Sequence, residues 1–184
     1  MITPATGRLL IAEPFMKDDS FKRGVVMLCR YDDDGALGFV MNKDSGFTLE
    51  ELIPELAGFT IPVFMGGPVQ QDTLHFIHQY PEILKDAVPI HEQGVYWGGN
   101  FLVLQSALKK GLIGSDKMKF FLGYSGWDHG QLEREIQEKS WIVSAANKKI
   151  IFDVEPENIW KESLLLSGPE YRMLINFPTD PQLN

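Results

Sequence analysis

The densest group of side chains that could do chemistry lies between Leu122 and Glu133, where a predicted strand meets a predicted helix. The group comprises Tyr124, Ser125, Trp127, His129 and Gln131. In hydrolases a nucleophilic serine occupies a sharp strand-turn-helix with the pattern G-x-S-x-G, and Trp127 stands where that pattern needs a second small residue. The segment therefore favours a structural turn in which Asp128 or a neighbour caps the helix.

The order of the residues also argues against a hydrolase. In that fold the histidine follows the serine after a long interval that carries the acid, whereas His129 is the last histidine of this chain and lies close to Ser125. We predict no catalytic residue. A small hydrolase with its site in the segment from Tyr124 to Gln131 remains the alternative, because folding could bring a carboxylate to Ser125 or His129.

Glycines near turns can hold an anion through free backbone amides. Neither G-x-G-x-x-G nor the P-loop lysine pattern occurs, so a nucleotide phosphate is not the expected ligand. Gly66, Gly67 and Pro68 are more typical of a turn than of a phosphate cradle.

The histidines show no spacing typical of metal ligands. His75 and His78 would point to opposite faces of a strand, and no pattern singles out Asp72 or Asp86 as an oxygen ligand. The three aspartates before Gly35 superficially resemble a calcium loop, but the side chain at the position where such a loop needs an oxygen ligand is an arginine. We predict no metal and no cofactor.

The elements that position these residues begin with strands. Apolar runs at 25–29 and 36–41 flank a turn that ends at Gly35 and predict a β-hairpin. Residues 61–65 and 73–78 predict a second strand pair joined through the Gly-Gly-Pro turn. Further strands are expected at 95–97, 118–124, 141–145 and 149–152.

Helices are predicted at four places. Thr48 and Glu51 have the spacing of a capping box, and Asn100 can cap a second helix. A third helix at 131–139 has a narrow apolar stripe and a Glu135–Lys139 pair, so we expect it to face solvent. The last begins after Pro156. Short strands interspersed with helices, without regular alternation, predict an α+β fold.

Composition sets the remaining bounds. The chain has 184 residues and a formal net charge of −8, which disfavours general binding to nucleic acid. Its single cysteine, Cys29, excludes an internal disulfide, is expected to be buried and fits a reducing cytoplasm. No apolar run approaches the roughly 18 residues of a membrane span. We predict one domain at residues 1–177 and a disordered tail at 178–184.

Four sequence blocks together resemble the AlgH/YqgE family of bacterial proteins. They are Gly7–Pro14 with Phe21–Val26, Gly35–Asn42, Pro62–Val69 with Leu74–His78, and Phe121–Trp127 with Gly130–Glu133. The resemblance implies an α+β fold with a branched, mainly antiparallel sheet, partly closed into a small barrel, and helices packed outside. The family is often labelled as transcriptional regulators, and the resemblance brings no agreed catalytic residues. This chain departs from the family pattern at Gly24 and at Asp128-His129.

These observations favour a cytoplasmic, non-enzymatic binding or regulatory protein. Exposed Tyr124, Trp127 and His129 would suit contact with a protein or a small ligand. The partner and the oligomeric state stay open, and direct DNA binding is the least favoured class because of the negative charge. The predicted recognition surface consists of Gly66, Gly67, Pro68, Tyr124, Ser125, Trp127, His129 and Gln131.

Overall fold

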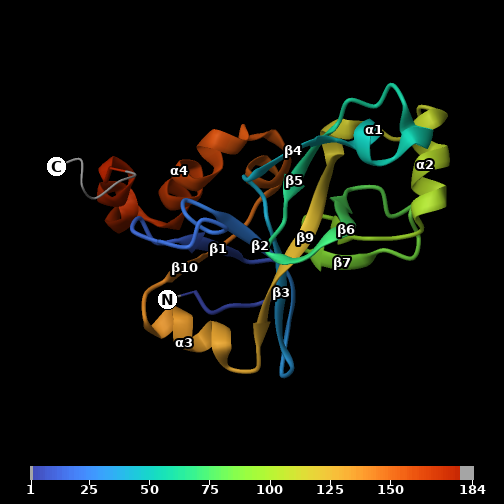
Figure 1. Ribbon diagram of the computed structural model, residues 1–184. Helices are drawn as coiled ribbons and strands as arrows, with labels where there is room; N and C mark the ends of the chain where they lie inside the picture. The colour runs from blue at the N-terminus through green and yellow to red at the C-terminus, as the bar shows by residue number, and fades with distance from the viewer. Residues whose placement is uncertain (1, 179–184) are drawn as a thin grey trace.

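The computed structural model describes residues 2–178 (Figure 1). Apart from Pro178, the predicted tail lies outside the described residues. The strands are β1 (Leu9–Ala12), β2 (Val25–Asp32), β3 (Gly35–Val40), β4 (Asp44–Thr48), β5 (Pro62–Met65), β6 (Val69–His78), β7 (Val88–His91), β8 (Val95–Trp97), β9 (Met118–Asp128) and β10 (Trp141–Ser144). The α-helices are α1 (Leu49–Leu52), α2 (Phe101–Lys109), α3 (Gln131–Gln137) and α4 (Pro156–Ser167). Shorter helical turns are η1 (Pro54–Leu56), η2 (Ser115–Lys117), η3 (Lys149–Asp153) and η4 (Pro169–Asn176).

The strands form a ten-stranded sheet in the order β10-β1-β2-β3-β9-β6-β8-β7, with β4 and β5 joined off this path. Among the described pairings only that of β5 with β9 is parallel. The predicted α+β class with a mainly antiparallel sheet is therefore confirmed. Partial closure into a barrel stays a prediction, because the strand order has two ends, at β10 and β7.

Strand β9 connects the two parts of the molecule. Figure 1 shows it as a long strand with β1, β2, β10 and α4 on one side and β6, β7, α1 and α2 on the other. Its side chains enter three separate apolar cores, since Phe121 packs into the first, Phe120 into the second and Trp127 into the third. Alternation of side chains along a strand allows one element to serve cores on both faces.

The predicted hairpin is confirmed as β2 and β3, whereas the predicted second pair is wrong. β5 and β6 do not pair with each other, because β9 lies between them and pairs with both. The chain crosses over β9 at the Gly-Gly-Pro turn, where the Gly66 amide donates to the Leu122 carbonyl at 2.8 Å. A turn rich in glycine permits a crossover as readily as a hairpin.

The predicted strand at 149–152 is also wrong, because these residues form η3, a turn of π-helix. The Asn147 side chain accepts a hydrogen bond from the Ile150 amide at 2.9 Å and starts that turn. Short apolar runs do not by themselves distinguish a strand from a buried helical turn. Strands β1, β4 and β7 and the turn η4 were not predicted.

The predicted helix starts are confirmed at α1 and α2. Thr48 and Glu51 form the capping box of α1. The Asn100 side chain accepts hydrogen bonds from the Leu102 and Val103 amides and caps α2. Within residues 2–178, no helix combines the length and the apolar character needed to cross a membrane.

Candidate functional site

Two glycine-containing segments, Gly66–Pro68 and Gly123–Ser125, cross in direct backbone contact, and we call this the glycine crossing. A Cβ atom on Gly67 would lie 2.2 Å from the carbonyl of Tyr124. Gly123 has φ +65°, and a Cβ atom there would lie 2.7 Å from the carbonyl oxygen of Gly67. Side chains do not fit at such distances, so the crossing requires glycine. The structure thus brings together five of the predicted site residues.

Ser125 holds the glycine crossing together. Its side chain is 0% exposed, and its hydroxyl donates a hydrogen bond to the Gly66 carbonyl at 3.0 Å. The residue lies within β9, which continues to Asp128, so the predicted turn at Ser125 is wrong. A buried hydroxyl that donates to a backbone carbonyl is not activated by a base. The geometry gives the hydrolase alternative no support.

Tyr124 belongs to a group of half-buried aromatic rings beside the glycine crossing. Its ring packs edge-to-face against His75 on β6, with centroids 6.0 Å apart. The His75 ring also lies 6.4 Å from Trp97 on β8. Burial lowers the pKa of His75, and the Thr73 hydroxyl lies 3.0 Å from its Nε2. The neutral imidazole is therefore favoured, and the floor formed by His75, Trp97 and Tyr124 is largely apolar.

The start of β6 forms the rim beside Tyr124, which pairs with Val69. The polar residues Gln70, Gln71 and Asp72 are exposed there, as is Pro68 just before the strand. Gln70 has φ +45°, in the left-handed region, where β6 shifts its register against β9. A residue without glycine's freedom is strained in this conformation, and such strain concentrates at functional sites. We call the three rings with this rim the aromatic surface.

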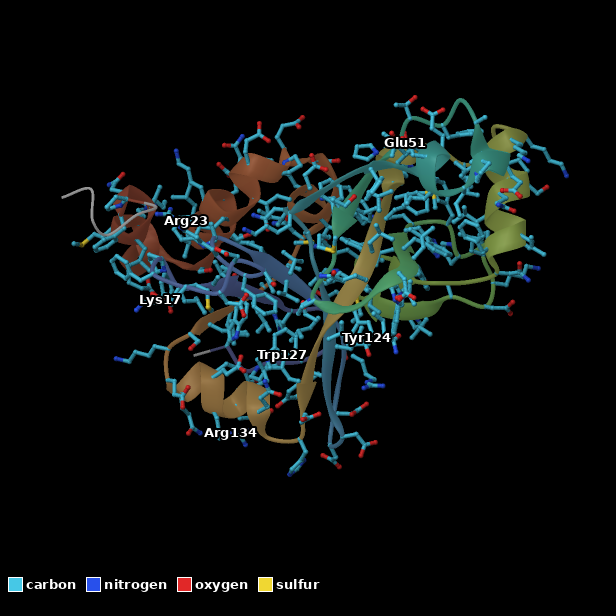
Figure 2. All side chains as sticks on the ribbon, viewed as in Figure 1. Lys17, Arg23, Glu51, Tyr124, Trp127 and Arg134 are labelled. Carbon is cyan, nitrogen blue, oxygen red and sulfur yellow. The ribbon has the colours of Figure 1, made fainter. Side chains whose placement is uncertain are left out.

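Trp127 does not belong to the aromatic surface, and its predicted exposure is wrong. The side chain is 6% exposed, and its Nε1 donates to Glu135 on α3 at 2.8 Å. The Glu135 carboxylate also accepts hydrogen bonds from Trp141 Nε1 and Gln131 Nε2, both at 2.8 Å. Figure 2 labels Tyr124 and Trp127, with Tyr124 on the β6 side. Trp127 and Gln131 therefore anchor α3.

This anchoring also corrects the prediction for α3. Glu135 does not pair with Lys139, because its carboxylate points inward to the two indole groups. Asp128 does not cap the helix, since the N-cap residue is Gly130 and no side chain bonds there. Instead the Asp128 amide donates to the Gln131 side chain at 3.0 Å. The helix is thus held by its inner face, which the apolar stripe alone did not indicate.

His129 lies at the far end of β9, apart from the aromatic surface. Its side chain is exposed, and Nδ1 lies 2.6 Å from the Asp33 carbonyl oxygen at the β2–β3 turn. A cavity of about 420 Å³ opens beside it. Within this cavity the Tyr31 hydroxyl donates to Glu133, which lowers the pKa of that carboxyl. The predicted surface is therefore not continuous, because Trp127 and Gln131 hold α3 and His129 lies beside a separate cavity.

The two histidines of β6 lie in different surroundings. His75 contacts Phe39 and Tyr124, while His78 packs against Phe76 and Tyr96, so the two histidines share no ligand position. Among the described residues, no three His, Cys, Asp or Glu side chains are grouped to hold a metal ion. Burial raises the pKa of the Cys29 thiol, which makes it inert.

Sequence reasoning missed two features. His75 and Trp97 belong to the aromatic surface, but only strand register brings them to Tyr124. A groove of about 710 Å³ runs beside the edge strand β10, between α3 and η4, and contains none of the predicted residues. Phe15, Trp141 and Leu174 are among its apolar walls. No single motif signals this groove, since its walls come from distant segments.

Comparisons with known proteins place the chain in a family. A family model described as AlgH-like matches residues 9–172. A UPF0301 protein from Cytophaga hutchinsonii is 42% identical over 97% of this chain and 98% of its own length. One from Parabacteroides distasonis is 40% identical over 100% of this chain and 93% of its own length.

Solved structures agree with this placement. The solution structure of the AlgH protein from Pseudomonas aeruginosa has a TM-score of 0.74 and 28% identity, covering 97% of this chain and 98% of the other. A protein from Corynebacterium diphtheriae shares the fold with a TM-score of 0.79 at 19% identity, covering 96% of this chain and 94% of the other. These matches supply no specific biochemical activity. The chain belongs to the AlgH-like family.

Proposed function

We propose that the protein is a cytoplasmic, non-enzymatic binding protein with a regulatory role, and that the aromatic surface recognises its partner. The observation that carries this proposal is the convergence of His75, Trp97 and Tyr124, half-buried, beside the glycine crossing. Tyrosine and tryptophan dominate the binding energy of many interfaces, because they bury a large area at a small entropic cost. An apolar floor with a polar rim is also the usual anatomy of such a surface.

The charge of the protein indicates which partners suit this surface. With a net charge of −8, the mean field attracts cations and repels phosphate backbones. The faces of Tyr124 and Trp97 can take a flat or a positively charged group. A partner that presents an aromatic or basic side chain, or a small ligand of the same chemistry, therefore fits better than DNA. The residues Gly66, Gly67, Pro68 and Ser125 would act by fixing the backbone below Tyr124.

The experiment that tests this proposal uses immobilised protein in a native lysate. The wild-type chain, Tyr124→Ala and a matched control, Leu102→Ala, are compared, since Leu102 is 73% exposed on α2 and is not part of the aromatic surface. Retained proteins and small molecules are identified by mass spectrometry. We expect a component that wild type and the control retain and that Tyr124→Ala retains at least about tenfold less.

An unchanged profile in all three samples would show that the aromatic surface does not carry recognition. Thermal unfolding of each variant verifies that the loss does not come from misfolding. Addition of Trp97→Ala to Tyr124→Ala sharpens the test, because the second ring contributes independently to the same floor.

A further inference from the structure

A third pocket, on the α4 side of the molecule, gathers positive charge. Its cavity of about 420 Å³ lies where the residues before β2, the end of β3 and the start of α4 meet. Four cationic side chains line it, with one carboxylate. They are Lys22, Arg23, Lys43 and Lys161, and the carboxylate is Glu157. We call this the cationic pocket. The charge of this pocket is positive, whereas the net charge of the chain is −8.

Arg23 is the most constrained of these residues. Its guanidinium carbon lies 4.1 Å from the centroid of the Trp160 ring, and one Nη donates to the Phe177 carbonyl. Figure 2 labels Arg23 close to α4. Its Nε is buried, and among residues 2–178 it has no hydrogen-bond partner. The planar guanidinium is thus held in place by stacking on the Trp160 ring, while its Nε–H donor has no acceptor among these residues.

The backbone at Arg23 is strained and clamped. Its φ is +55°, in the left-handed region that arginine rarely adopts. The Asn42 side chain secures this conformation, because its Nδ2 donates to the Arg23 carbonyl at 2.8 Å and its Oδ1 accepts from the Val25 amide at 3.0 Å. Strain that the surrounding structure maintains in this way is typical of a functional position.

Lys43 adds charge to the same place. Its ammonium donates to the Lys22 carbonyl at 2.5 Å, which brings the two lysines together. The pKa of Lys43 is lowered, first by burial and also by the charge of Lys22, whereas Asp19 opposes the shift. Like charges that approach each other in a half-buried site are stabilised by a counterion.

Within the described residues no protein carboxylate forms an ion pair with any of the four cations, and only the more distant charge of Asp19 acts on Lys43. The ion pair found among the described residues joins Arg30 and Asp32, outside the pocket. Glu157 lines the pocket but, within this part of the chain, makes no ion pair with any of the four cations. Gathering four cations in a half-buried pocket is costly, and an anion that accepts hydrogen bonds from the lysine ammonium groups and the Arg23 Nη groups offsets this cost, although the buried Nε is not open to it.

We propose that the cationic pocket binds the phosphate group of a small phosphorylated molecule. An arginine fork recognises phosphate oxygens in a bidentate manner, and the lysines match the double charge of a phosphate monoester. The positive end of the twelve-residue helix α4 lies at the same pocket, without a side-chain cap. The cavity has room for phosphate and a small organic group. This site is separate from the aromatic surface and does not depend on the proposed function.

The test is a titration of ¹⁵N-labelled full-length protein with inorganic phosphate, followed by NMR. We expect saturable shifts of the Arg23 Nε–H signal and of the Lys43 amide. Lys43→Gln should raise the dissociation constant by about tenfold, and Lys161→Gln by a smaller factor. Lys161 is exposed, so its variant should fold even if changes at Arg23 or Lys43 do not.

Two controls make the test specific. Lys109→Gln, a lysine at the end of α2, should leave the dissociation constant unchanged, and so should Tyr124→Ala. Glycerol 3-phosphate should bind at least as tightly as inorganic phosphate, and dimethyl phosphate, a singly charged diester, about tenfold more weakly. The proposal is overturned if the shifts do not saturate, if Lys109→Gln weakens binding as much as Lys161→Gln, or if the diester binds equally well.

Discussion

The two ends of the segment from Gly123 to Gln131 perform different tasks, although they lie next to each other in the chain. At the first end, Gly123 and Gly67 cross with backbone against backbone, and Tyr124 is left half-buried beside the crossing. At the second end, Trp127 is buried and its indole donates to Glu135. The first end depends on close backbone packing that only glycine permits. The second end depends on hydrogen bonds between side chains.

This difference shows that an aromatic residue near glycines can be either partly exposed or buried. Tyr124 and Trp127 look equivalent in the sequence, but only Tyr124 keeps part of its ring accessible. The partner available to each ring decides the outcome, since Glu135 takes the Trp127 indole into the interior. If the glycine crossing and the Glu135 anchor are two independent supports of this segment, substitutions at each should destabilise the protein by different amounts.

The largest effect is expected at the glycine crossing. Gly123→Ala places a Cβ atom 2.7 Å from the carbonyl oxygens of Gly67 and Val69 and also strains a φ of +65°. We expect a loss of about 3 kcal/mol or more in the free energy of unfolding, measured in urea.

The matched control is Gly46→Ala. Gly46 has φ +79°, but no atom lies within 4 Å of the place that a Cβ atom would take, so only the backbone cost of about 1 kcal/mol remains. Equal losses for the two variants would show that the close approach at the crossing is unimportant.

A smaller loss is expected at the second end. Glu135→Ala leaves the indole N–H groups of Trp127 and Trp141 without their acceptor, which should cost about 2–3 kcal/mol. Glu135→Gln retains a carbonyl oxygen and should cost about 1 kcal/mol. Urea unfolding measures both. Glu138→Ala, an exposed change on the C-terminal side of the same helix, should stay within about 0.5 kcal/mol, and a loss there as large as at Glu135 would contradict the anchor.

The smallest effect concerns the aromatic surface and depends on pH. Burial lowers the pKa of His75 in the folded protein, so the unfolded chain binds a proton more readily below its ordinary pKa of about 6.5. Stability is therefore full above that pH and falls as the pH drops through it. In His75→Gln the fall between about pH 8 and 5 should be smaller, though not absent, because burial also lowers the pKa of His78 and His91. Unfolding curves across this range measure it, and identical falls in both proteins would exclude a contribution from His75.

Local patterns predicted much of the fold. The Asp-Gly signal located the β2–β3 hairpin, and Thr48 and Asn100 located two helix starts, because each pattern satisfies its own backbone groups within a few residues. The crossover at Gly66 was not predictable in this way. Its partner is β9, more than fifty residues later, and the glycines fit a hairpin and a crossover equally well.

The same distinction between local patterns and contacts of distant segments applies to the candidate sites. Gly66 and Tyr124 were noticed because glycines and aromatic residues gather in short motifs, although the contact with His75 needed the strand register. The cationic pocket gave no such signal. Lys22 and Arg23 look like solvated turn residues until α4 brings Trp160 against the guanidinium. Convergence of several distant segments can be read only from the folded chain.

The position of β9 between the cores also determines how the molecule opens. This one continuous strand pairs with β3 along residues 125–128 and with β5 and β6 along residues 118–124, so both neighbourhoods share it. We expect the amides of Met118–Asp128 to exchange slowly and at similar rates along the whole strand, whereas faster exchange in one part would show that this part opens separately. If β9 exchanges uniformly, the two parts of the molecule unfold as one cooperative unit, and a ligand that stabilises either part should slow exchange in the other.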